Sequence, residues 1–243
     1  MLILAFDTSG VAGSVAVLDG IQILGEATLD AARRSAQTLA PAIAELLGSQ
    51  RIKPAQIRLI ATTVGPGSFT GLRVGVTTAK TFAYAVGAEV MGISTLEAIA
   101  HGVPAHFLDD KPQEIQAVID AQRKEFFLGR FRTEGGGVAY ELPRITRTDA
   151  DAIVSMQEWI AGLQAGTIVT GTGVSRVESL LPADVVVAPA EHREPKAMVV
   201  GRLAWRNYQA GRRDDLWKLT PVYLRPSYAE EKAKATKPNS GAL

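Results

Sequence analysis

Apolar and polar positions along the first hundred residues predict strands and helices in a definite order. Runs rich in aliphatic residues read as strands, and Asp19-Gly20 between two of them is a typical hairpin turn. From Ser35 onward, apolar residues recur at helical spacing instead. The predicted elements of this half are strands at 2–6, 14–18, 21–29, 59–64 and 90–93, and helices at 35–47, 68–86 and from Ser94 onward.

The second half repeats the order of strands and helices, although its residues resemble the first half little. Its predicted elements are strands at 115–120, 125–132, 138–145, 167–170 and 184–188, and helices at 149–163, 174–181 and 196–210. Two βββαβαβα units side by side indicate an α/β protein with two ribonuclease-H-like lobes, the architecture of the actin-like ATPase fold. We therefore expect lobes at 1–104 and 105–228, with the last helix packing on the first lobe as an alternative, and a flexible polar tail at 229–243.

Composition and charge narrow the class of protein. The 243 residues carry a formal net charge of +1, so the surface as a whole does not attract a polyanion, and we expect contact with tRNA to be weak or indirect. There are no cysteines, which fits the cytoplasm. No apolar run is long enough to span a membrane.

One aspartate closes the first strand of each predicted unit. Asp7 and Asp120 could face the cleft between the lobes, where paired carboxylates would hold a Mg²⁺–nucleotide through water. Thr8 and the turn glycine Gly173 would then lie close to the nucleotide. The alternative is that each aspartate accepts backbone N–H groups in the turn after its strand, and the absence of glycine from 120–123 favours it.

The turn before the second helix is a candidate anion site. Gly67 and Ser68 belong to Gly65-Pro66-Gly67-Ser68-Phe69-Thr70-Gly71-Leu72-Arg73, which places N–H groups at a helix N-terminus. No Gly-Lys-Ser/Thr follows, so this is not a Walker A loop, and the glycine spacing differs from that of dinucleotide-binding turns.

Small residues recur every four positions along the helix at 68–86. The positions are Gly71, Gly75, Ala79, Ala83 and Gly87. Such a stripe lets another element approach closely, and glycine inside a helix costs roughly 1 kcal/mol relative to alanine. The pattern alone leaves open whether that element belongs to the same chain or to another subunit.

Metal and nucleophile chemistry find little support in the sequence. The three histidines, His101, His106 and His192, include no pair at the i, i+4 spacing of a helical metal site. No serine lies in a Gly-x-Ser-x-Gly turn, which argues against a serine hydrolase. We therefore expect neither a catalytic residue nor a metal site.

Several segments resemble the TsaB family, also called YeaZ. The hallmark is the segment from Gly65 to Gly75, and the resemblance continues at 3–9, 92–97, 119–121 and 221–225, so that it covers roughly residues 1–225. It implies the two-lobed actin-like fold and a role in placing threonylcarbamoyl on adenosine 37 of tRNA. In that system the related subunit TsaD holds the metal and transfers the group, and the ATPase TsaE joins them.

The resemblance also implies that this chain is not the catalytic subunit. The catalytic relative carries His-x-x-x-His after the fifth strand, and the matching positions here are Thr95 and Ile99, which offer no imidazole. Relatives in the TsaB family often have a histidine near the start of the first helix, where this chain has Ser35.

The resemblance further implies that the helices at 35–47 and 68–86 contact TsaD or a second copy of the chain. The predicted contact residues are Leu39, Ile43, Leu46, Phe69, Arg73, Gly75 and Ala79. A nucleotide at that interface is the cofactor that the family allows, and the tail lysines Lys232, Lys234 and Lys237 are weak candidates for tRNA contact. The alternative function is an actin-like-fold small-molecule kinase or ATPase that uses Asp7, Gly173 and Asp120.

Overall fold

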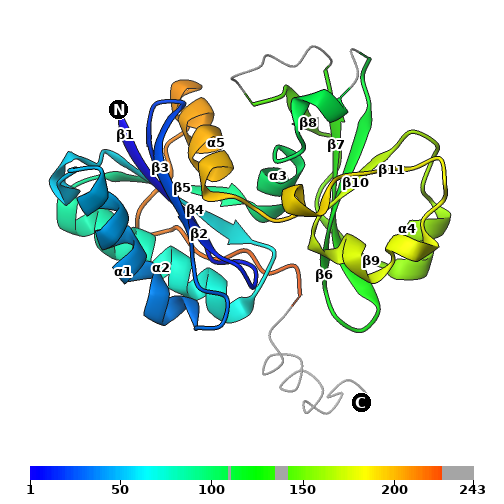
Figure 1. Ribbon diagram of the computed structural model, residues 1–243, viewed down its shortest axis with the longest axis horizontal. Helices are drawn as coiled ribbons and strands as arrows, with labels where there is room; N and C mark the ends of the chain where they lie inside the picture. Colours follow the sequence, from blue (N-terminus) through cyan, green and yellow to red (C-terminus); the bar gives the residue numbers. More distant parts are fainter. Residues whose placement is uncertain (109–110, 135–141, 226–243) are drawn as a thin grey trace, which may run out of the picture.

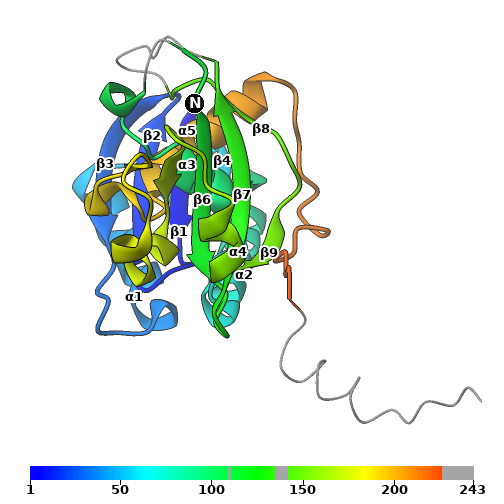
Figure 2. The same ribbon diagram turned by 90° about the vertical axis from the view of Figure 1, so that its right-hand side faces the viewer.

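The computed structural model describes residues 1–108, 111–134 and 142–225. They form two α/β lobes, each built on one mixed sheet (Figure 1). The second lobe stands in front in the view of Figure 2. None of the helices in the described part of the chain is long and apolar enough to cross a membrane.

The first sheet contains five strands in the spatial order β3-β2-β1-β4-β5. The β2–β3 and β1–β2 pairs are antiparallel, whereas β1–β4 and β4–β5 are parallel. The strands are β1 (Leu2–Asp7), β2 (Ser14–Asp19), β3 (Gln22–Thr28), β4 (Leu59–Gly65) and β5 (Glu89–Ser94). All five strands predicted from the pattern of this half are confirmed to within two residues.

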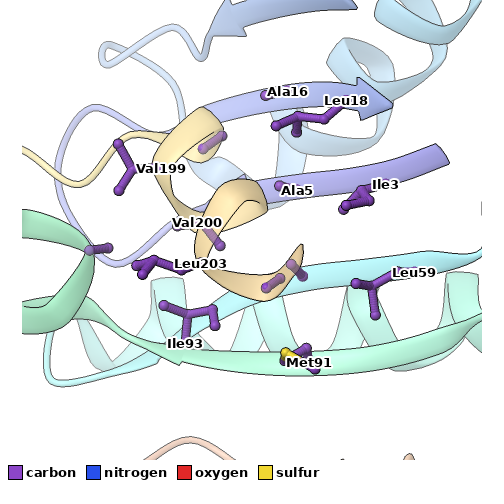
Figure 3. Close-up of a cluster of buried hydrophobic side chains, with 14 residues drawn as sticks. Ile3, Ala5, Ala16, Leu18, Leu59, Met91, Ile93, Val199, Val200 and Leu203 are labelled. Atoms are coloured by element: carbon purple, nitrogen blue, oxygen red, sulfur yellow. The ribbon is translucent and has the colours of Figure 1, made fainter. Parts of the chain in front are cut away.

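Helices cover both faces of this sheet. On one face α1 (Ser35–Ser49) and α2 (Phe69–Val86) pack side by side, as the amphipathic pattern predicts. On the other face lies α5 (Ala197–Gln209), whose Val200 and Leu203 pack on Ala5 and Ile93 (Figure 3). Strand β1 is apolar on both faces, and its side chains therefore pack against helices on each face of the sheet.

The second sheet repeats the order of the first. Read from β8, its path is β8-β7-β6-β10-β11, which is again third-second-first-fourth-fifth along the chain when β9 is left out; β9 pairs with β7 off this path. The strands are β6 (Glu114–Asp120), β7 (Glu125–Thr133), β8 (Ile145–Arg147), β9 (Ala152–Ser155), β10 (Ile168–Thr170) and β11 (Val186–Val187). The repeated order identifies the duplicated two-lobed fold that the sequence predicts.

The helices of the second unit are shorter than predicted. In place of a helix over 149–163 there are β9 and the short α4 (Met156–Ala161), because 152–155 pair with the edge of β7. In place of a helix over 174–181 there are two 3₁₀ turns, Thr172–Arg176 and Glu178–Leu180. Part of the predicted strand 138–145 lies outside the described residues. Three further 3₁₀ turns are Pro54–Gln56, Ala105–Phe107 and Ala190–His192.

The third helix of each unit packs on the sheet of the other unit. Helix α3 (Thr95–Ala100) follows β5, yet its Leu96 and Ile99 pack in the core of the second lobe. Helix α5 follows β11 and returns to the first sheet. The first lobe is thus completed by residues far along the chain.

The segment Asp214–Arg225, called the strap below, runs from the first lobe to the second. It begins against β5, where Asp214 pairs with Val90 and accepts a hydrogen bond from the Gly92 N–H at 2.9 Å. Leu216 and Leu219 pack on the core under α2. The sequence analysis singled out 221–225 as a motif but did not place it.

Candidate functional sites: the end of β1 and the outer face of α1 and α2

Asp7 is a fully buried carboxylate at the end of β1. Its Oδ1 accepts hydrogen bonds from the Ser9 N–H (3.1 Å), the Ser9 hydroxyl (2.6 Å) and the Thr63 hydroxyl (2.6 Å). Its Oδ2 is buried and has no hydrogen-bond partner in the described part of the chain. Burial, opposed by these hydrogen bonds and reinforced by Glu194, raises the pKa of Asp7 to about 6.

The predicted anion turn packs directly on the residues that follow Asp7. The Ser68 N–H donates to the Ser9 carbonyl at 2.7 Å, and the Thr8 hydroxyl donates to the Gly71 carbonyl at 2.8 Å. A Cβ on Gly67 would lie 2.7 Å from the Ser9 carbonyl oxygen. The structure therefore brings Asp7, Thr8, Gly67 and Ser68 together, and the two loops fill the space beside each other.

Ser68 also begins α2 in the way expected of an N-cap residue. Its hydroxyl accepts a hydrogen bond from the Gly71 N–H at 3.2 Å. The Ser68 hydroxyl therefore satisfies one of the N–H groups at the start of α2 that could otherwise bind a phosphate.

Asp120 and Gly173 belong to the second lobe and have structural partners there. Asp120 accepts from the Gln122 N–H at 2.9 Å and pairs with Arg176 at 2.6 Å. Both aspartates thus accept the N–H two residues further on, as the turn alternative predicts. A Cβ on Gly173 would lie 2.9 Å from the Phe126 ring, so packing within the lobe explains this glycine.

A groove of about 610 Å³ lies beside the loop between β1 and β2. Its charged lining residues are Glu26, Glu191, Glu194 and Lys196, from the end of β3 and the segment that leads into α5. Burial raises the pKa of Glu194. The five residues predicted to bind a nucleotide do not line this groove.

His101 is buried inside the protein, and so are Thr95 and Ile99, the two positions where the catalytic relative has histidines. His101 is buried, and its pKa is lowered to about 3 by burial and by Arg206, which contacts its Nε2 at 3.0 Å. Thr95 and Ile99 are buried in α3. Among the described residues no cluster of three or more His, Asp or Glu side chains could hold a metal ion.

Five of the seven predicted partner-contact residues are used inside the chain, and this part of the prediction is wrong. Leu39, Ile43 and Leu46 pack in the core under the sheet. A Cβ on Gly75 would lie 2.6 Å from the Thr8 hydroxyl, and Ala79 is fully buried. The small-residue stripe of α2 therefore lets that helix approach the chain's own strands, not another subunit.

The two other predicted contacts, Phe69 and Arg73, lie in the first turns of α2. The Arg73 guanidinium sits 4.0 Å from the centre of the Phe69 ring, and its Nε donates to the Tyr223 hydroxyl at 3.1 Å. The Tyr223 ring stacks on Phe69 with 4.4 Å between centres. The strap thus adds an aromatic residue to this surface that the sequence analysis did not assign.

The outward face of α1 and α2 carries few charged residues, and its α1 part consists largely of small side chains. On α1 it carries a second small-residue stripe, and all four of its members are exposed: Ala36, Ala40, Ala44 and Gly48. The two helices hold three charged residues in all, Glu45, Arg73 and Lys80, and Lys80 donates to strap carbonyls at 3.0 and 3.1 Å. We call the exposed residues of these two helices the α1–α2 face.

An exposed aromatic pair joins the α1–α2 face to the strap. Tyr84 and Trp217 are 69% and 70% exposed and meet edge to face with 5.7 Å between ring centres. The helical pattern predicts the elements here, but the pairing of a helix residue with one 133 positions later is a tertiary contact that no local pattern encodes.

The repeated strand order of the two sheets defines the class: a two-lobed α/β protein of the actin-like type. The family model for TsaD, described as tRNA N6-adenosine threonylcarbamoyltransferase, matches residues 28–160, more than half of the chain. The chain therefore belongs to the family that this model describes.

The similarity to relatives extends over nearly the whole chain. The tRNA threonylcarbamoyladenosine biosynthesis protein TsaB of Bacillus subtilis is 27% identical over 96% of this chain and 97% of its own length. The Escherichia coli protein of the same name is 25% identical, with 96% and 98% covered. YeaZ from Pseudomonas aeruginosa has the same fold, with a TM-score of 0.74 at 24% identity over 92% of this chain and 99% of its own.

Proposed function

We propose that the chain is a non-catalytic subunit required to form N6-threonylcarbamoyladenosine at adenosine 37 of tRNA. The observation that carries the proposal is the near full-length similarity to two proteins named for the biosynthesis of this nucleoside. The positions that match the metal-binding histidines of the catalytic relative are Thr95 and Ile99, which supports a role without metal chemistry. The cytoplasm is the compartment that this role implies.

The partner that we propose is the TsaD subunit, bound on the α1–α2 face. A surface with few charges and small side chains lets helices of a second protein approach closely and loses little hydration on binding. Binding there would stabilise the competent form of TsaD, because a partner changes activity only through different affinities for its two states. TsaE would join this assembly, and tRNA contact by this chain stays indirect.

A second copy of the chain is the other occupant of the same face. In that case a homodimer forms in isolation, and TsaD displaces one copy. A nucleotide, if the assembly holds one, belongs to the interface with TsaD, since the loops after β1 and before α2 fill the space beside Asp7.

The test of the proposed function is formation of the modified nucleoside on a tRNA with adenosine at position 37. All other components of the system are supplied, and this protein is added or omitted. We expect product only when it is present and none when it is alone. Equal product without it, together with nucleotide turnover by the isolated protein and Mg²⁺, would favour the small-molecule kinase or ATPase instead.

A charged side chain on the α1–α2 face is expected to weaken the complex with TsaD without unfolding the chain. Ala40→Arg places a long cation in the middle of the exposed stripe, where a docked helix would bury it. We expect affinity for TsaD, measured by titration calorimetry, to fall at least about tenfold. Nucleoside formation at limiting concentrations should fall with it.

Ala161→Arg is the matched control, because Ala161 is also an exposed helical alanine but lies on α4 of the second lobe. It should leave the affinity unchanged. Equal affinities for wild type and both variants would place TsaD on another surface.

A further inference from the structure

One end of the interlobe cleft is held by α3. This helix gives Ala98 to the core of the first lobe and Leu96 and Ile99 to that of the second. Near its start, Arg147 of β8 donates to the Ser94 hydroxyl at 3.0 Å, which adds a direct bond between the lobes. Figure 1 shows α3 between the two sheets and the strap below it.

The strap is fixed along the first lobe before it reaches the second. Its Val222 N–H donates to the Val64 carbonyl at 2.7 Å, which places the strap backbone against the end of β4. The Gly65 backbone leaves no room for a side chain there, since a Cβ would lie 2.4 Å from the Val222 carbonyl oxygen. The strap backbone is therefore fixed at the end of β4 before the chain reaches the cleft.

At the cleft, Arg225 crosses to the second lobe and bonds to both ends of one tight turn. Its guanidinium donates to the Ala121 carbonyl at 2.5 Å and pairs with the Glu125 carboxylate. The Arg225 side chain is 18% exposed and the Glu125 side chain 37%, so the arginine end of this pair is the better shielded from solvent. A hydrogen bond between charged groups is stronger than one between neutral groups, and more so away from water.

The turn that receives Arg225 has a strained backbone. The consecutive residues Gln122, Arg123 and Lys124 have φ values of 64°, 54° and 61°, which side-chain-bearing residues rarely adopt. Such conformations persist where the surroundings hold them in place. Arg225 binds residues on both sides of this strained run and is therefore one of the contacts that hold it in place.

We propose that the strap is an interlobe clasp that Arg225 closes on the turn between β6 and β7. The lobes are joined at α3, and the clasp restrains them at the opposite end of the cleft. When the Arg225 contacts break, the lobes rotate about α3 and the cleft between them widens at the Arg225 end. The clasp therefore sets how far the two lobes open.

The absence of cysteine from the chain makes the clasp directly measurable. Glu45→Cys on α1 and Gln157→Cys on α4 place one spin label on an exposed helical site of each lobe. Double electron–electron resonance then gives the distribution of interlobe distances. Arg225→Ala, in this labelled full-length protein, removes both clasp contacts.

Arg225→Ala is expected to raise the population outside the wild-type distance peak by on the order of tenfold, because it removes a charge-assisted pair. Glu125→Gln should raise it less, since the bond to the Ala121 carbonyl remains. Arg176→Ala is the matched control. It removes an ion pair within the second lobe, between Arg176 and Asp120, and should leave the peak unchanged.

A distance distribution for Arg225→Ala that superimposes on the wild-type one overturns the clasp. An equal broadening in Arg176→Ala also overturns it, because the cause would then be a loosened second lobe. Where melting curves show that Arg225→Ala does not fold, Glu125→Gln decides by the same criterion. The measurement uses the isolated chain, so its outcome is independent of the proposed role in tRNA modification.

Discussion

Replacing Gly71 by alanine is expected to destabilise the folded chain by about 3 kcal/mol or more. Alanine normally stabilises a helix relative to glycine, but a Cβ at this position would lie 1.8 Å from the Thr8 carbonyl oxygen. The clash is with backbone, so it cannot be relieved by a rotamer change. Either α2 or the loop after β1 must move, and the bond from the Thr8 hydroxyl to the Gly71 carbonyl is then lost.

Gly48→Ala in α1 is the matched control for this substitution. A Cβ there would meet no atom within 4 Å, so the ordinary helix preference of alanine should appear as a gain of up to about 1 kcal/mol. Urea unfolding followed by circular dichroism measures both. A Gly71→Ala variant as stable as wild type would show that the two loops do not pack as tightly as described.

Asp7→Asn is expected to stabilise the chain in a way that depends on pH. At low pH both the folded and the unfolded chain carry a protonated Asp7. As pH rises past the ordinary pKa of 3.8 the unfolded chain ionises first, and the folded chain follows only near its raised pKa of about 6. The wild type therefore loses stability across this window, by about 3 kcal/mol in total.

Asparagine keeps an oxygen for the bonds from Ser9 and Thr63 but never ionises. The stability advantage of Asp7→Asn should therefore grow by about 2.5 kcal/mol between about pH 4 and about pH 7.5, since part of the change has already occurred at pH 4. Asp30→Asn, at an exposed aspartate, is the control and should stay within about 0.5 kcal/mol at both pH values. A difference for Asp7→Asn that does not change with pH would mean that Asp7 ionises as freely as in the unfolded chain.

A carboxylate that destabilises its own fold at neutral pH is more typical of a functional site than of a structural one. The loops beside Asp7 are nevertheless closed on each other. If TsaD binding separates these loops, the unpaired Oδ2 of Asp7 becomes the group that is exposed.

The sequence predicted the first lobe well because its elements are long and its periodicities strong. The second lobe was predicted less well, because its elements are short and take their form from their neighbours. Residues 152–155 have a helix-like pattern with 156–161, yet they form β9 because the edge of β7 offers backbone partners. Such a preference for a sheet edge lies in the tertiary structure, not in the local sequence.

The predicted partner contacts show a different limit. An amphipathic pattern says that Leu39, Ile43 and Leu46 must be buried, but it does not say by what, and here the chain's own sheet buries them. The exposed stripe on α1 could have been found by the same search that found the stripe of α2, because both have members every four residues. The aromatic contacts of the strap could not, since an extended segment has no periodicity that aims its side chains at α2.

The exchange of α3 and α5 between the lobes has a consequence for synthesis on the ribosome. The strands of the first sheet are complete once residue 94 has emerged, but the face formed by Ile3, Ala5 and Leu59 stays uncovered until Val200 and Leu203 follow. The strands of the second sheet lie within 114–187, and α3, which packs on them, has already been made. The C-terminal lobe can therefore finish folding first, which reverses the usual N-to-C order, and a nascent chain halted before α5 presents an open apolar sheet to chaperones.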